Sequence, residues 1–153
     1  MAGTSYTQRS LAHLRKQGYR AEVVERWMPF TATQNTAEGD GRAQGGGYRR
    51  DLFKFIDIIA ITPSGILAVQ STSKQQLAAH RRKIVHTDEI RDAVIDWLVC
   101  GAHFRLWGWV KVGARWQVTE QELDVAELHR AKQIATEEGW RKAGKPAQVG
   151  LVL

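Results

Sequence analysis

The chain has 153 residues, of which 43% are hydrophobic, enough for one folded domain with a sizeable core. Its 22 lysines and arginines against 16 aspartates and glutamates give a formal charge of +6, so a polyanion such as nucleic acid is the expected partner. A basic protein without such a partner is the alternative. No apolar run approaches the roughly 20 residues of a membrane span, and the N-terminus lacks a signal-peptide core, which predicts a soluble, cytoplasmic protein.

The first half of the chain shows patterns typical of a helix, strands and a long loop. Apolar residues at helical spacing predict a helix over 4–18, and the run 22–28, which a proline follows, predicts a strand. Segment 31–48 is rich in glycine and polar residues, so we expect a long flexible loop there. Two β-branched runs over 52–61 and 66–73, joined by Thr-Pro-Ser-Gly, predict a hairpin.

The second half predicts three helices and a second hairpin. We expect helices over 75–85, 87–100 and 120–138, and strands over 104–112 and 115–119. A capping box of Thr119 and Glu122 is expected to begin the last helix, and Gly139 to end it. The order α-β-β-β-α-α-β-β-α in a single domain, 1–153, predicts an α/β fold with a mixed sheet flanked by helices.

The cysteine and the tryptophans are expected in the core. Cys100 follows an apolar run and is predicted to be a buried thiol. Because the chain has one cysteine, a disulfide framework is excluded and a reducing compartment is favoured. Most of the six tryptophans are expected to be buried, with Trp107 and Trp109 on one face of their strand. The five histidines lack metal-ligand spacing, which argues against a zinc site.

The first hairpin carries the candidate site. Asp57 interrupts the apolar run of one strand and Gln70 that of the next, and a charge in such a strand must be compensated. Because side chains alternate along a strand, the two residues can meet on one face. Their oxygens suit Mg²⁺ or Mn²⁺ as a cofactor. Alternatively, Asp57 pairs with an arginine and Gln70 bonds to the backbone.

The elements and motifs around these residues resemble those of a known nuclease superfamily. A helix and a strand precede Ile-Asp57-Ile-Ile-Ala, and Ala-Val-Gln70-Ser-Thr72 follows on the next strand. Over about residues 4–112 this pattern resembles the PD-(D/E)xK nucleases, above all archaeal-type Holliday junction resolvases and related small phage or bacterial nucleases. The resemblance implies a restriction-endonuclease-like core, Mg²⁺-dependent hydrolysis of branched or duplex DNA, and a homodimer.

The resemblance assigns catalytic positions residue by residue. Asp57, Gln70 and Thr72 take the family's Asp, Glu and Lys positions, and only Asp57 keeps the charge. The missing positive charge could come from Lys74, on the same strand parity as Thr72, or from Lys83 in the following helix.

The metal ligands and the function leave alternatives open. The family's acid on the first helix is missing here, and Glu22 or Glu25 on the preceding strand could replace it, so Asp57, Gln70 and Glu25 form the expected metal set. The lost charges also fit a catalytically weakened or inactive nucleic-acid-binding or assembly protein on the same fold. A plain protein-interaction module is the third interpretation.

Two groups of basic residues are expected to bind DNA phosphates. The expected contacts are Arg42, Arg49, Arg50, His80, Arg81, Arg82 and Lys83. The first three precede the Asp57 strand, and the others give the helix over 75–85 a strongly positive surface, which would make binding dependent on salt. The alternative is that these residues only form a solvated surface.

Overall fold

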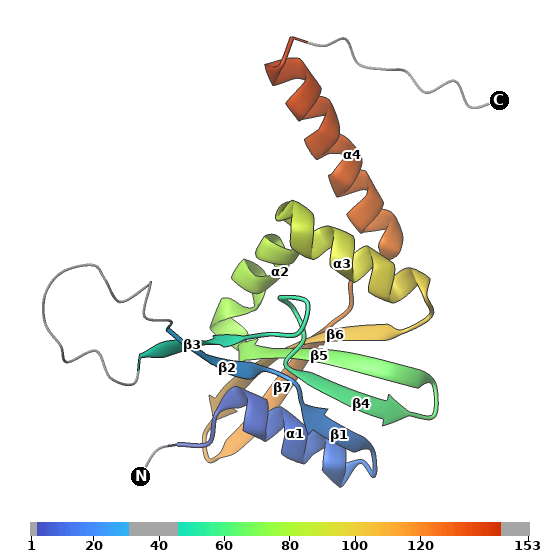
Figure 1. The fold of residues 1–153 in the computed structure, drawn as a ribbon. Coiled ribbons are helices and arrows are strands. Elements are labelled where there is room, and N and C mark those ends of the chain that lie inside the picture. The colour runs from blue at the N-terminus through green and yellow to red at the C-terminus, as the bar shows by residue number, and fades with distance from the viewer. Residues whose placement is uncertain (1–2, 31–45, 145–153) are drawn as a thin grey trace, which may run out of the picture.

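The computed structural model describes residues 3–30 and 46–144, and these residues form four α-helices, a short 3₁₀ turn and seven strands (Figure 1). The helices are α1 (Tyr6–Lys16), α2 (Leu77–His86), α3 (Asp88–Val99) and α4 (Val125–Lys142), with the 3₁₀ turn η1 (Lys74–Gln76) directly before α2. The strands are β1 (Arg20–Val23), β2 (Arg26–Pro29), β3 (Gly47–Arg50), β4 (Ile58–Thr62), β5 (Gly65–Ser73), β6 (His103–Val112) and β7 (Arg115–Gln121).

Five strands form a mixed sheet in the order β1-β4-β5-β6-β7. Strands β5 and β6 are parallel, and α2 and α3 make the crossover between them, whereas the other neighbouring pairs are antiparallel. Helix α1 packs on one face of the sheet, and α2 and α3 cover the other (Figure 1). The predicted α/β architecture, a mixed sheet flanked by helices, is therefore confirmed.

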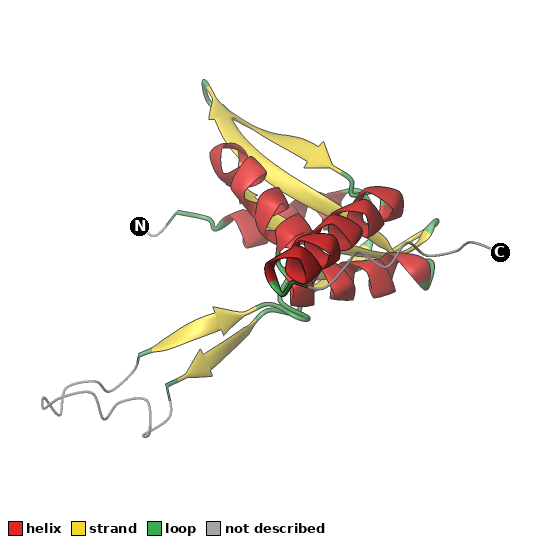
Figure 2. Ribbon diagram, turned by 90° about the horizontal axis from the view of Figure 1, so that it is seen from above, coloured by secondary structure: helices red, strands yellow, loops and turns green. Residues whose placement is uncertain are grey.

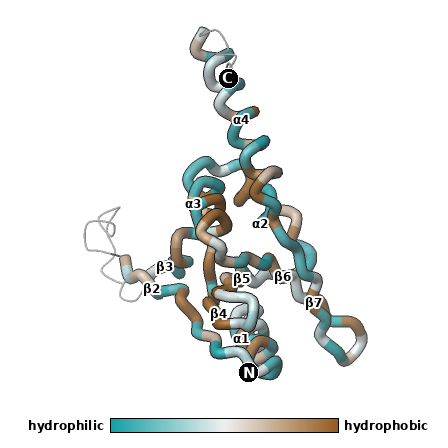
Figure 3. Tube along the Cα trace, turned by 90° about the vertical axis from the view of Figure 1, so that its right-hand side faces the viewer, coloured by the Kyte–Doolittle hydropathy of each residue, from teal (hydrophilic) through white to brown (hydrophobic). Residues whose placement is uncertain are grey.

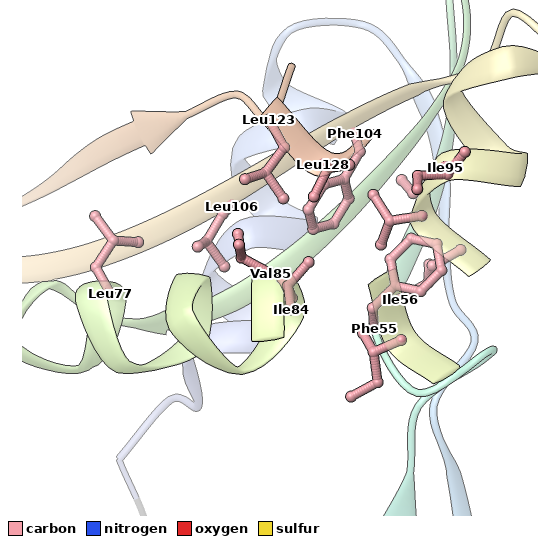
Figure 4. Close-up of a cluster of buried hydrophobic side chains, with 13 residues drawn as sticks. Phe55, Ile56, Leu77, Ile84, Val85, Ile95, Phe104, Leu106, Leu123 and Leu128 are labelled. Carbon is pink, nitrogen blue, oxygen red and sulfur yellow. The ribbon is translucent and has the colours of Figure 1, made fainter. Parts of the chain in front are cut away.

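The core has one layer on each face of the sheet. Between the sheet and α2 and α3, the fully buried Phe55 packs edge-on against Phe104, and Leu106 lies close by (Figure 4). Burying a side chain of this size stabilises the fold by about 1.5–3 kcal/mol. On the other face, Leu14 of α1 packs in a second buried cluster that includes Trp109. Both sheet faces are thus apolar, and polar groups on them need a reason.

Helix α1 lies within the predicted range of 4–18, and its two ends have clear physical causes. The Ser5 hydroxyl accepts a hydrogen bond from the backbone N–H of Gln8, which caps the helix. Gly18 follows the helix at a φ of 88°, a left-handed conformation that favours glycine. On the buried face, Ser10 accepts hydrogen bonds from Trp109 Nε1 at 2.8 Å and from the Ser71 hydroxyl at 2.6 Å. These bonds join α1 to β5 and β6.

The predicted strand over 22–28 is in fact two strands in different sheets. Strand β1 pairs with β4, but β2 pairs with β3 in a separate antiparallel ribbon that projects from the domain (Figure 2). Residues 31–45 of the predicted loop lie outside the described residues. Its last residues, Gly47 and Tyr48, belong to β3 and not to a loop.

The predicted strand over 52–61 begins only at Ile58. Phe53 and Lys54 have φ values of 52° and 67°, so the chain turns at this point instead of extending. A continuous strand would place Phe53 and Phe55 on one face, but Phe53 is 59% exposed and Phe55 is fully buried.

Three further predictions need correction. Strand β7 continues past Thr119 to Gln121, so helix α4 begins only after Asp124, whose side chain accepts a hydrogen bond from the Ala126 N–H. The helix also continues past Gly139 to Lys142. Cys100 is exposed, since it caps the end of α3. Only Trp107 and Trp109 are buried among the tryptophans.

Helix α4 packs its first turns against α2 and α3 and then extends away from the body (Figure 1). Figure 3 shows hydrophilic residues along much of its outer part. Among the described residues, no helix has both the length and the apolar character needed to cross a membrane.

Candidate metal centre

Three carboxylates converge where β4 begins. Glu25, Asp51 and Asp57 each offer an oxygen atom, and these atoms all lie within 4.8 Å of one another. Asp57 is buried, and the other two side chains are half-buried. Three negative charges this close repel one another strongly in a partly dry site, so the arrangement favours a bound cation or a bound proton.

The projecting ribbon positions two of the three acids. Glu25 directly precedes β2 and Asp51 directly follows β3. Because Arg26 pairs with Arg50 at this end of the ribbon, the register places Glu25 and Asp51 side by side at its base. The backbone N–H of Val24 donates to the Asp57 carbonyl at 2.8 Å, which ties this base to the start of β4.

Asp57 is held in a position that disfavours its charge. Its side chain is 5% exposed, and the Ser71 backbone N–H donates to Oδ2 at 2.7 Å. Burial, together with the negative charge of Asp51, raises the pKa of Asp57 from 3.8 to about 8, although the Ser71 hydrogen bond opposes the shift. A divalent cation among the three acids would reverse this balance and keep Asp57 ionised.

Gln70 offers a further oxygen ligand beside Asp57. Ile58 pairs with Val69, so the same register continued by one residue places Gln70 opposite Asp57, on the same face of the sheet. Gln70 is 6% exposed, and its Oε1 has no hydrogen-bond partner among the described residues. A buried amide oxygen without a partner costs about 1–3 kcal/mol, which a metal or a metal-bound water would remove.

The position that carries lysine in the resembled family is uncharged and enclosed. Thr72 is 6% exposed and lies opposite Gly108 of β6. Lys74 has left the strand for η1, where it is exposed. Lys83 is exposed on α2, close enough to His80 to influence its ionisation. Thr72 is thus uncharged at this position, and both candidate lysines are exposed on the segment that follows β5.

Helix α2 faces the acidic cluster. The pKa of His80 is lowered by burial and by the positive charge of Lys83, and the negative charge of Asp51 opposes both effects. His80 and Lys83 are therefore within electrostatic range of each other, and His80 is within range of Asp51.

The other predicted DNA contacts have different environments. Arg49 forms an ion pair with Glu25 at 2.7 Å and so lies beside the metal centre. The alternative interpretation required an arginine paired with Asp57 instead. Arg50 and Arg82 are exposed, and Arg42 lies outside the described residues. Arg81 is occupied by both carboxylate oxygens of Glu127, so it anchors α4.

Sequence patterns predict Asp57 and Glu25 as metal ligands but not Asp51. A continuous strand over 52–61 would carry Asp51 away from Asp57. The turn at Phe53 and Lys54 brings it back. The missed signal is a second acid beside Arg49-Arg50, on the flank of the apolar strand.

Comparisons with known proteins identify no relative: no family model, no curated protein and no solved structure matches the chain.

Proposed function

We propose that this protein is a Mg²⁺- or Mn²⁺-dependent DNA endonuclease on a restriction-endonuclease-like core, with Glu25, Asp51 and Asp57 as metal ligands. The convergence of these three carboxylates around a buried aspartate carries the proposal. Hard oxygen donors of this kind are the ligands that Mg²⁺ and Mn²⁺ prefer. The mixed sheet with helices on both faces supports the fold assignment.

The donor set fits a divalent cation in charge and in hydrogen bonding. The ion would offset two of the three negative charges of the carboxylates and give the Oε1 of Gln70, which has no partner among the described residues, a direct or water-mediated contact. When bound, Mg²⁺ would polarise a phosphate ester and lower the pKa of a water molecule. The chain itself positions the ligands, and the hydrogen bond from the Ser71 N–H holds the Asp57 carboxylate in place.

The basic residues around the centre support DNA as the substrate. Lys74, Arg82 and Lys83 are exposed on the segment that follows the Gln70 strand. Exposed cations of this kind can hold phosphates, and Lys83 is the candidate for the charge that Thr72 does not provide. Resolvase-like action on branched DNA, by a homodimer in the cytoplasm, belongs to the same proposal.

One observation favours a second candidate, a DNA-binding protein on this fold with weakened or lost catalysis. Thr72 is buried and uncharged at the family's lysine position. If no other cation takes over its part, the protein would bind metal and DNA without cutting.

The test measures metal binding and cleavage separately. Mn²⁺ binding is followed by calorimetry, and labelled four-way junction, duplex and single-stranded DNA are incubated with Mg²⁺, Mn²⁺ or EDTA. Asp51→Asn and Asp57→Asn are expected to weaken metal binding and abolish cleavage. Asp96→Asn, which changes an exposed acid on α3, is the matched control and is expected to change neither.

The outcomes separate the two candidates. Metal-dependent cutting that both site variants lose supports the endonuclease. Metal and DNA binding without cutting supports the second candidate. An unchanged metal affinity in both site variants would contradict the proposed metal centre.

A further inference from the structure

A cavity of about 770 Å³ lies at the base of the ribbon, between the ribbon and α3. Its size falls within the range of about 300–1,000 Å³ for small-ligand sites. Two of the proposed metal ligands, Glu25 and Asp51, form part of its wall, so the cavity opens directly beside the metal centre. A group bound in it would lie next to anything held by the metal.

The rim of the cavity carries an exposed aromatic ring. Phe53 lines the cavity and is 59% exposed, so it is not needed for the core. It has a φ of 52°, a left-handed conformation that phenylalanine rarely adopts. The adjacent turn holds this conformation through hydrogen bonds from Leu52 N–H to the Ile56 carbonyl and from Lys54 N–H to the Asp51 carbonyl. Strain of this kind, paired with an exposed ring, is typical of functional positions.

The remainder of the wall combines apolar and cationic side chains. Met28, Val24 and Ala93 line the cavity together with Arg50 and Lys54. Lys54 also pairs with Glu89 of α3 at 2.7 Å, which fixes its position at the rim. An aromatic and apolar wall with cations suits a flat heterocycle that carries a phosphate.

We propose that this cavity holds one unpaired nucleotide next to the phosphate at the metal centre, with its base stacked on Phe53. The inference rests on the proposed function and deepens it, because it assigns the substrate class: DNA with an unstacked base beside the cleaved bond, as at a branch or in a single strand. Three carboxylates line the cavity, and among these described residues only Glu89 is paired with a cation of the same wall, Lys54. Glu25 and Asp51 repel a phosphate, so the site accepts the nucleotide only when a divalent cation is bound.

The test is a coupling experiment between the protein and the DNA. Single abasic residues are placed one at a time around the mapped cleavage position, and affinity is measured in Ca²⁺, which takes oxygen ligands like Mg²⁺. At one position the abasic residue is expected to weaken wild-type binding by about tenfold, the scale of base–aromatic stacking. Phe53→Ala is expected to lower the affinity for intact DNA by a similar factor. On the DNA with that abasic residue, Phe53→Ala and the wild type are expected to bind equally.

Two variants guard against a merely structural effect. Tyr6→Ala removes another exposed aromatic ring, on α1 and outside the cavity, and is expected to leave DNA affinity unchanged. Phe53→Gly removes the ring and fits the left-handed backbone, so its melting temperature should stay the same or rise while its affinity falls. Phe53→Trp should retain binding.

Each outcome has a distinct meaning. Effects of Phe53→Ala and the abasic residue that multiply, or a Phe53→Gly variant that melts earlier, overturn the nucleotide site while leaving the endonuclease standing. A wild-type protein that neither binds nor cuts any DNA with divalent metal overturns both proposals.

Discussion

The Asp57 carboxylate accepts a hydrogen bond from the backbone N–H of Ser71, with 2.7 Å between Oδ2 and the nitrogen. The hydroxyl of the same serine points to the opposite face of the sheet and donates to Ser10 of α1 at 2.6 Å. Ser71 therefore connects the acidic cluster on one face to the helix on the other. Because both ends of this connection are embedded in strands and core, the orientation of Asp57 is fixed before any ligand binds.

Without divalent metal, the protein should lose stability as the pH rises from about 4 to about 8. The unfolded chain ionises Asp57 near its ordinary pKa of 3.8, but the folded protein keeps the proton until about pH 8. The folded state thus binds more protons across this interval, and its stability falls with rising pH. We expect the melting temperature in EDTA to drop by roughly 5 °C between pH 5 and pH 8.5.

Asp57→Asn is the control for this pH dependence. It keeps the shape of the side chain without a titrating group, so most of the drop should disappear. Mg²⁺ should stabilise the wild type more at pH 8.5 than at pH 5, since it binds the ionised ligands. Equal pH slopes in the variant and the wild type would show that other groups cause the drop.

Gln70→Leu should separate stability from metal binding. The change removes a buried carbonyl oxygen that has no partner among the described residues and fills the space with an apolar group of similar size. Replacing an unsatisfied polar group in this way is neutral or stabilising, by up to about 1–2 kcal/mol. Denaturant unfolding in EDTA should show that gain, and calorimetry should show weaker Mn²⁺ binding.

The matched change is Gln121→Leu in β7, outside the cluster of Glu25, Asp51 and Asp57. It removes another buried amide oxygen that has no partner in the described part of the chain. It should leave Mn²⁺ binding unchanged. A Gln70→Leu variant that binds Mn²⁺ as tightly as the wild type would remove Gln70 from the metal site.

Gly108→Ala should destabilise the fold. A Cβ at this position would lie 2.9 Å from the Lys74 Cα and 3.1 Å from Leu77 Cδ1, where β6 passes under the start of α2. Backbone cannot move aside cheaply, so we expect a loss of about 1–3 kcal/mol in the free energy of unfolding. Chemical denaturation measures it.

Gly139→Ala provides the opposite sign. Gly139 lies within α4, and a Cβ there meets nothing within 4 Å. Alanine favours a helix over glycine by about 0.5–1 kcal/mol, so this variant should be slightly more stable. A neutral Gly108→Ala would mean that η1 can shift away from β6.

Arg81→Ala and Arg82→Ala, neighbours on α2, should have different effects. Arg81 donates to both carboxylate oxygens of Glu127 and to the Glu122 carbonyl, so its loss should reduce stability by about 1–2 kcal/mol through α4. Arg82 is exposed, and its loss should leave the melting temperature unchanged.

For DNA binding, we expect Arg82→Ala to have the larger effect of the two variants. Arg82→Ala should lower the slope of log affinity against log salt by about 1, whereas Arg81→Ala should leave that slope unchanged. Titrations of labelled DNA at several salt concentrations measure both. Identical slopes for Arg82→Ala and the wild type would exclude Arg82 as a phosphate contact.

Local patterns were enough to predict most of the sheet and the helices. The runs that form β5 and β6 are rich in apolar, β-branched or aromatic residues, and α1, α2 and α3 follow helical spacing. The predictions failed where the local pattern was continuous but the chain was not. The apolar residues on both sides of Phe53 hid a turn, and the run over 22–28 hid a change from one sheet to another.

The sequence by itself determined the α/β class, the hairpin and the importance of Asp57, because a charge in an apolar strand is visible in the order of residues alone. Only the tertiary structure decided that Asp51 and Glu25 meet it. These two acids come together through the register of β2 with β3, a long-range pairing that no local spacing encodes. Strand pairing selects neighbours across the chain, so the composition of the metal centre is a property of the folded protein.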